Sequence, residues 1–242
     1  MKLKQTAIAL SLTTLGVLFG STSAEAFTFK GHYSEAEFEA LGIEIPWAAE
    51  TRIGLVGTGE HEINIHDATN SSQNRVQANY DNWVSGQAVD FSLIFDDIAQ
   101  TLTYTVAGIE ISKTNIGVSN FSDLLIRTTA RVDGSSMVVD NLFLTDSVMS
   151  GAIAANSSAA CSGGVGCSYW DSEYLHIGNI VGGFTLTGQS TMTWLDGKKP
   201  TRSQLAYQIK LVEGEGDVTV PEPAAISLFS LGLLGLLAKR KQ

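Results

Sequence analysis

Short stretches of alternating apolar and polar residues run through the middle of the chain. From Val89 to Phe95 every second residue is apolar, and after residues 96–100 the segment 101–106 alternates Thr with Leu102, Tyr104 and Val106. Alternation of this kind places the apolar side chains on one face of a strand. The two segments together predict a hairpin with one buried face.

Three further segments carry the same signal. Residues 124–132 lead through Asp133-Gly134 into 137–144, and Asp-Gly between two apolar β-type runs predicts a tight turn and a second hairpin. Residues 184–194 and 205–211 also alternate. Strands at this spacing, without helical patterns between them, predict an all-β fold, an antiparallel β-sandwich that resembles a jelly roll.

One helix is expected near the start of this region. Ser34 followed by Glu37, with Phe38 and Leu41 behind them, fits a capping box that opens a helix of about two turns. We expect this helix to cap an edge of the sandwich.

The two ends of the chain differ from the middle. Residues 1–26 combine Lys2 and Lys4, an uncharged stretch and a final Ala24-Glu25-Ala26, which is the three-part pattern of a secretory signal peptide cut by signal peptidase after Ala26. The alternative is an uncleaved N-terminal anchor. The remaining organisation is then a body at 27–219 and a C-terminal segment at 220–242.

The C-terminal segment has three parts in a fixed order. Pro221-Glu222-Pro223 comes first, the uncharged residues 224–238 follow, and Lys239, Arg240 and Lys241 form a basic tail. Fifteen helical residues span about 22 Å, less than the roughly 30 Å hydrocarbon core, so they predict a short transmembrane helix. The basic tail would stay on the cytoplasmic side of the inner membrane.

This ordered combination resembles the sorting signal of bacterial PEP-CTERM proteins. The resemblance implies processing by exosortase, a membrane-embedded transpeptidase of Gram-negative bacteria that make exopolysaccharide. It assigns the sorting motif to Pro221, Glu222 and Pro223. Two prolines keep this stretch extended, so a protease-like site could bind it as a strand while the helix sets its depth. An ordinary membrane anchor is the alternative.

Two pieces of the body are similar to choice-of-anchor domains, the all-β bodies of several PEP-CTERM proteins. They are residues 82–87 and 139–144. This resemblance implies an all-β body and transfers no catalytic residue.

Charge limits the partners of the body. The whole chain has a net charge of −10, and its two ends hold five basic and two acidic residues, which leaves the body with 10 basic and 23 acidic residues. Such a balance favours solubility and excludes nucleic acid as an expected partner, and it also predicts repulsion of acidic glycans.

Cys161 and Cys167 are the only cysteines. They flank a loop of small residues, and in an exported chain we expect them to pair in a disulfide that contributes about 2 kcal/mol. A redox or haem role would need a Cys-x-x-Cys spacing, which five intervening residues do not give.

The histidines do not form a metal motif. His61 and His66 are five residues apart, whereas the zinc-protease helix needs four, and on one strand they would face opposite sides. We therefore expect exposed edge or loop histidines, no zinc, and no catalytic triad.

Acidic pairs leave two alternatives open. They could supply oxygen ligands to calcium, the one ion we consider, although no EF-hand pattern is present and no cofactor is otherwise expected. Two loop carboxylates could also serve a polysaccharide-acting enzyme, which no linear spacing can show. The pairs are Asp96-Asp97, Asp140-Asn141, Asp171 with Glu173, and Glu213, Glu215 and Asp217.

Tyr169-Trp170, just after the cysteine loop, is the candidate ligand contact for a sugar.

Taken together, these features predict an exported, exosortase-sorted protein of the cell surface or extracellular matrix. Its body would be a non-catalytic structural or binding module associated with exopolysaccharide. A carbohydrate-binding, lectin-like domain and a polysaccharide-acting enzyme are the alternatives.

Overall fold

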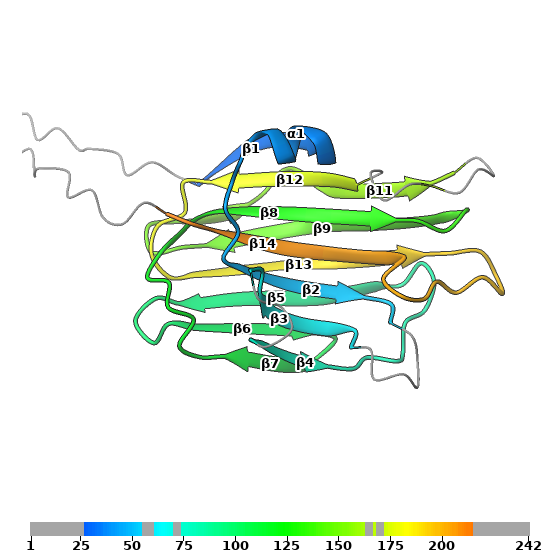
Figure 1. The fold of residues 1–242 in the computed structure, drawn as a ribbon, viewed down its shortest axis with the longest axis horizontal. Helices are drawn as coiled ribbons and strands as arrows, with labels where there is room; N and C mark the ends of the chain where they lie inside the picture. Colours follow the sequence, from blue (N-terminus) through cyan, green and yellow to red (C-terminus); the bar gives the residue numbers. More distant parts are fainter. Residues whose placement is uncertain (1–26, 55–60, 70–73, 163–166, 168–171, 215–242) are drawn as a thin grey trace, which may run out of the picture.

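The structure is a computed structural model that describes residues 27–54, 61–69, 74–162, 167 and 172–214. These residues form two packed antiparallel sheets with one short helix, which confirms the predicted all-β class (Figure 1). In this part of the chain no helix is long and apolar enough to cross a bilayer.

Sheet A has seven strands. In spatial order they are β1 (Thr28–Ser34), β12 (Ser172–Gly178), β8 (Phe121–Ala130), β14 (Leu205–Glu213), β2 (Trp47–Arg52), β3 (Ile63–Asp67) and β4 (Arg75–Ala78).

Sheet B also has seven strands. Six follow one another as β10 (Ser150–Ala152), β9 (Ser135–Thr145), β13 (Phe184–Thr193), β5 (Ala88–Asp96), β6 (Thr101–Val106) and β7 (Ile109–Lys113), and β11 (Ser157–Cys161) pairs with β9 beside β10.

The predicted hairpin at residues 89–106 is confirmed as β5 and β6, which pair from Phe91 with Val106 to Asp96 with Thr101.

The second predicted hairpin, at residues 124–144, is wrong. β8 belongs to sheet A and β9 to sheet B, so the turn at Asp133-Gly134 carries the chain from one sheet to the other. The apolar inward residues of both strands face the same core, and each strand pairs with distant strands instead of with the other.

The core lies between the two sheets and is built from the inward residues of each strand. Phe95 of β5 packs edge-on against Phe121 of β8, with ring centroids 4.7 Å apart. Two buried tyrosines cross the same layer, and the hydroxyl of Tyr104 donates to that of Tyr207 at 2.8 Å while contacting the Thr51 hydroxyl at 2.7 Å. These contacts satisfy the hydroxyl groups of the two tyrosines, which the core encloses.

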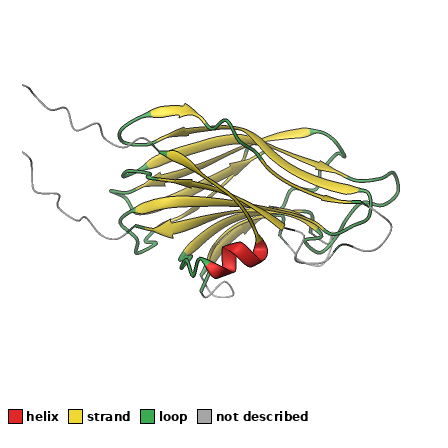
Figure 2. Cartoon of the chain, turned by 90° about the horizontal axis from the view of Figure 1, so that it is seen from above, coloured by secondary structure: helices red, strands yellow, loops and turns green. Residues whose placement is uncertain are grey.

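The helix α1 (Glu35–Ala40) begins at the predicted capping box, in which the Ser34 side chain accepts from the Glu37 backbone and the Glu37 side chain accepts from the Ser34 backbone. It lies on the outer face of sheet A, at the edge formed by β1 and β12 (Figure 2). There the ring of Phe38 stacks on Tyr174 of β12 with centroids 4.2 Å apart.

The first and last described residues lie at one end of the sandwich (Figure 1). Thr28 pairs with Gly178 and Glu213 pairs with Phe121, whereas Leu205 pairs with Ala130 at the opposite end. Strands β2, β8 and β13 all finish at that opposite end.

Candidate functional site: a basic groove on sheet A

The outer face of sheet A carries a row of polar residues that crosses five strands. The register aligns one outward residue from each of β3, β2, β14, β8 and β12, in the order Asn64, Glu50, Gln208, Arg127 and Tyr174. Since alternate residues of a strand face opposite sides, each lies next to inward residues that build the core. The row is therefore a direct product of the same alternation that makes the sandwich.

Small residues beside this row create a hollow. Ala206 is the outward residue of β14 next to Gln208, and it lies between Arg52 of β2 and Thr129 of β8. Ala206 lines an open groove of about 250 Å³, a second groove of about 310 Å³ adjoins it, and both are lined by Glu50, Arg52 and Gln208. We call the two together the sheet A groove, whose other lining residues are His61, Asn64, His66, Arg75, Arg127, Thr129, Arg131, Ser203, Ala206 and Tyr207.

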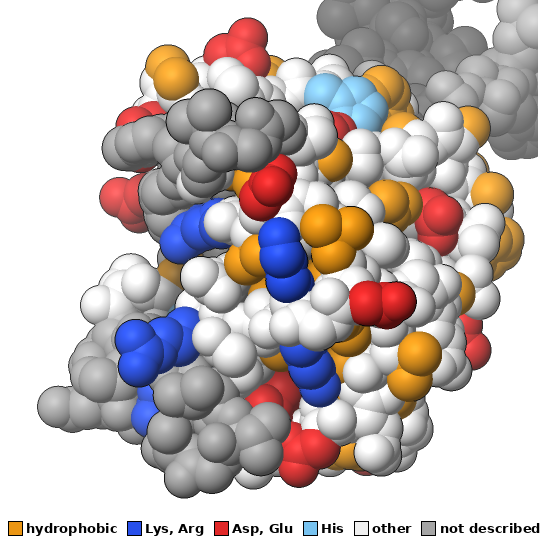
Figure 3. All heavy atoms as spheres, turned by 90° about the vertical axis from the view of Figure 1, so that its right-hand side faces the viewer, with side chains coloured by type: hydrophobic (Ala, Val, Ile, Leu, Met, Phe, Trp, Pro, Cys, Tyr) orange, Lys and Arg blue, Asp and Glu red, His pale blue; other side chains and the backbone are white. Residues whose placement is uncertain are grey.

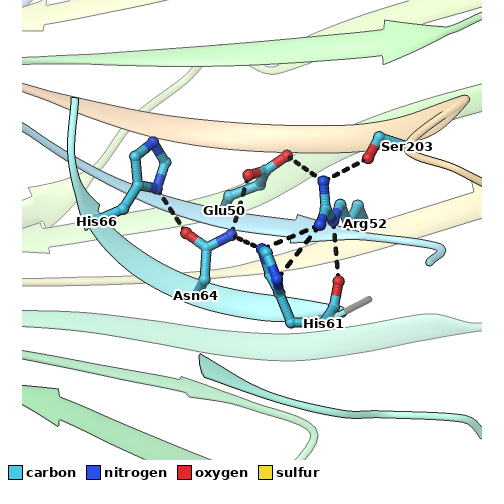
Figure 4. A network of polar contacts seen from close by, with 6 residues as sticks. All are labelled: Glu50, Arg52, His61, Asn64, His66 and Ser203. Atoms are coloured by element: carbon cyan, nitrogen blue, oxygen red, sulfur yellow. Dashed lines mark hydrogen bonds and ion pairs between the residues drawn. The ribbon is translucent and has the colours of Figure 1, made fainter. Parts of the chain in front are cut away.

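A network of polar contacts holds one half of the groove (Figure 4). The Asn64 amide donates to Glu50 at 3.0 Å and contacts Nε2 of His61, while its oxygen contacts Nδ1 of His66. Because the amide nitrogen faces a carboxylate, the Asn64 oxygen must accept, so Nδ1 of His66 carries the proton. The Nε2 atom of His66 points away from Asn64 (Figure 4).

Arg52 is fixed from three sides. Its Nε donates to the His61 carbonyl at 2.9 Å, one terminal nitrogen donates to the Ser203 hydroxyl at 2.7 Å, and the other contacts the His61 ring. Burial and the positive charge of Arg52 lower the pKa of His61 to about 4. His61 is therefore neutral near pH 7 and accepts hydrogen bonds from its neighbours.

The other half of the groove rests on a buried ion pair. Arg127 donates to the Glu35 carboxylate of α1 through Nε at 3.2 Å and through a terminal nitrogen at 2.9 Å, and Tyr174 donates to the same carboxylate at 3.0 Å. Burial and the nearby Arg127 lower the pKa of Lys210, which lies over the Phe38 ring. Helix α1 thus fixes the position of Arg127.

Positive charge is concentrated in this groove. Residues 27–219 contain five arginines, and four of them, Arg52, Arg75, Arg127 and Arg131, line it. Glu50 is the one carboxylate among its lining residues. Lys and Arg side chains also reach the surface at the end of the sandwich where β2 and β8 finish (Figure 3). Guanidinium groups beside amides and hydroxyls can bind an anion that also carries hydroxyl groups.

Sequence reasoning did not find this site, because its residues are dispersed over 150 positions of the chain. The usable signal was the position of the arginines in the alternating pattern of their strands. Arg52 and Arg127 each occupy an outward position of a strand whose inward residues are buried, but only the strand order brings them to one face.

The structure corrects the prediction for the histidines. His61 is buried and His66 is half-buried, and both contact Asn64, whereas the sequence predicted exposed residues on opposite sides. The parity argument failed because His61 precedes β3, which begins at Ile63, and so does not follow the strand's alternation.

Two of the acidic residues that were candidates for calcium make contacts within the protein. Asp96 accepts from the backbone nitrogens of Ile98 and Ala99, and no group of three His, Cys, Asp or Glu side chains suited to a metal occurs in the described residues. Glu173 contacts His32 and Ser158.

The other predicted site residues divide into two sets. Cys161 and Cys167 are joined by a disulfide with a sulfur–sulfur distance of 2.04 Å. The candidate sugar contact Tyr169-Trp170, the motif Pro221-Glu222-Pro223 and the basic tail Lys239-Arg240-Lys241 lie outside the described residues.

Comparison with known families identifies the C-terminal segment. Residues 219–241 match the PEP-CTERM protein-sorting motif. No curated protein matches the chain. The motif marks a secreted protein that is sorted by exosortase, its processing partner, in association with the cell envelope. The predicted similarity of the body to choice-of-anchor domains has no support.

Proposed function

We propose that this protein is a surface or extracellular-matrix module, delivered by exosortase, whose jelly-roll-like body binds without catalysing a reaction and associates with exopolysaccharide. The observation that carries this proposal is the sorting motif at 219–241 behind an all-β body. Sorting places such a body outside the cytoplasm, where saccharide polymers surround it.

Delivery would proceed in three steps. Signal peptidase removes residues 1–26, the helix at 224–238 holds the chain in the inner membrane, and exosortase cuts near Pro221-Glu222-Pro223. The two prolines keep the cleavage region extended in front of the helix.

The groove favours binding over glycoside hydrolysis. A glycosidase of the usual kind places two carboxylates on opposite sides of the scissile bond. Glu50 is the one carboxylate lining the sheet A groove, where Asn64 donates to it and Arg52 lies 4.0 Å away.

The mass of the intact protein, recovered from cells with and without exosortase, tests the delivery step. We expect loss of residues 1–26 in both strains and loss of the C-terminal segment only when exosortase is present. The variant Pro221→Ala/Pro223→Ala should keep the segment in both strains, and Pro200→Ala, which removes a proline outside the motif, should be processed normally. Equal masses in the two strains would refute exosortase sorting.

A further inference from the structure

The charge of this protein is divided unevenly between its surfaces. The body holds 23 acidic and 10 basic residues, yet four of its five arginines line one groove, where Glu50 is the one lining carboxylate and Glu35 pairs with Arg127. We infer that the sheet A groove binds an acidic saccharide chain, a linear polymer of uronic acid units, through its arginines. This inference deepens the proposed function, on which it rests for the extracellular location, by naming the ligand class. It also replaces the expectation from net charge that acidic glycans are repelled.

The spacing of the arginines suits a chain rather than a small ion. They lie on or directly after β4, β2 and β8, and one strand separates β4 from β2 and β2 from β8. Neighbouring strands are about 4.8 Å apart, so successive arginine positions are about 10 Å apart across the sheet. A single small anion cannot contact all of them, whereas a polymer with a repeated carboxylate can.

Two of the four guanidinium groups are held in place before any ligand arrives. Arg52 is bonded to the His61 carbonyl and Ser203, and Arg127 is bonded to Glu35 beneath α1. Binding groups that are already ordered lose less conformational freedom when they bind a ligand. Arg75 differs, because its side chain is exposed and makes no ion pair within the described residues.

Neutral polar groups between the arginines point to a sugar. Gln208, which lies between Glu50 and Arg127, lines both halves of the groove, and Thr129 and Ser203 line the same half as Arg131. Amides and hydroxyls can both donate to and accept from sugar hydroxyls. Glu50 and Arg52 line both halves, so the carboxylates of the ligand would bind at the arginines and away from Glu50.

Nucleic acid fits the same surface less well. Duplex DNA carries one negative charge per about 1.7 Å, and the acidic remainder of the body would repel so dense a charge. A polyuronate has one charge per sugar and offers hydroxyl groups between the charges, which matches the alternation of arginines with Gln208 and the hydroxyl side chains.

Calorimetric titration of the purified exported protein with oligogalacturonate tests the inference. Methyl-esterified oligogalacturonate has the same backbone without charge and serves as the matched ligand control. We expect binding of the acid form that weakens with added salt, because exposed ion pairs are screened, and no binding of the ester.

Two groove variants with matched controls locate the site. Arg75→Gln removes an exposed guanidinium, and Gln208→Glu adds a negative charge at the centre with almost no change of shape. Each should weaken binding about tenfold or more, which is the size expected when a charge-assisted hydrogen bond is lost or opposed. Lys198→Gln and Gln87→Glu make the same changes at exposed positions that do not line the groove, and they should bind normally.

Three results would overturn the inference. The first is absent binding of the acid form at low salt, or equal binding of acid and ester. The second is a groove variant that binds as well as its control. The third is duplex DNA that binds as tightly as oligogalacturonate and is equally sensitive to Arg75→Gln, which would reassign the groove to nucleic acid. Exosortase processing is measured on the C-terminal segment, so either proposal can fail alone.

Discussion

The two sheets of the sandwich share one core but have different outer faces. Along β5, β6 and β13 of sheet B the outward residues are mainly Thr, Ser and Asp, with no Arg or Lys among them. The outer face of sheet A instead carries long charged side chains, the helix α1 and the groove. An alternating pattern therefore specifies which side chains face the core, while the kind of outward residue separates a solvated face from a candidate binding face.

The difference extends to how the outward residues are held. On sheet B the contacts between outward side chains are exposed, as between the hydroxyls of Thr103 and Ser112 or where Gln189 donates to Asp90. On sheet A, Arg127 and Glu35 are buried, and Arg52 makes bonds to several neighbours. The charged groups of sheet A are thus part of the folded structure as well as of the groove, and their removal should have larger effects.

The largest effect is expected from Arg127→Met. This change leaves the Glu35 carboxylate buried without its cation, so the free energy of unfolding should fall by about 3 kcal/mol. Urea denaturation followed by circular dichroism measures it. The double variant Glu35→Gln/Arg127→Met removes the stranded charge and should regain most of the loss. Equal stability of the single and double variants would show that an unpaired Glu35 carboxylate does not destabilise the fold.

An intermediate effect is expected from pH acting on His61. The unfolded chain binds a proton near pH 6.5, whereas burial and Arg52 lower the pKa of folded His61 to about 4. Between these values the unfolded state binds more protons, so stability should fall as the pH falls, by about 2 kcal/mol once solvent screening is allowed for.

Urea denaturation at several pH values measures this slope. His61→Gln has no group that titrates there, so its stability should depend less on pH between 6.5 and 4. A variant with the same slope as the unaltered protein would assign the pH dependence to other groups.

The smallest effect is expected from Thr105→Arg on sheet B. Thr105 is an outward residue of β6, and its neighbours across the strands are Ser92 and Glu110. A surface change at such a position should alter the free energy of unfolding by less than about 0.5 kcal/mol. The oligogalacturonate titration should also be unchanged, because one arginine on a flat face has no neighbouring groove. Stronger binding would mean that charge alone recruits the ligand.

Local features of the fold could be predicted from the sequence because they depend on neighbouring residues. The hairpin of β5 and β6 follows from alternation and a short turn, and α1 follows from the capping box of Ser34 and Glu37. The turn at Asp133-Gly134 was assigned to a hairpin because an Asp-Gly turn looks the same whether it joins two strands of one sheet or connects two sheets. Only the distant partners of β8 and β9 decide between these arrangements.

The groove could not be predicted for a related reason. Arg75 and Arg131 are far apart in sequence, and they share one face only because β3, β2 and β14 lie between their strands. Net charge gave the opposite expectation, since a sum over the chain contains no information about where the charges lie. The sorting motif, by contrast, is a continuous stretch and could be read directly.

The path of the chain at Gly214 determines which part of the protein is presented outward. An attachment through the residues after Gly214 would hold the sandwich at the end where β14 finishes. Strand β14 begins beside Ala130 at the other end. Nine extended residues span about 30 Å, so Arg131 and the loop that carries Ser203 would project that far from the point of attachment. In a tethered molecule, the end of the sandwich where β2 and β8 finish would then face away from the attachment point and stay accessible to partners.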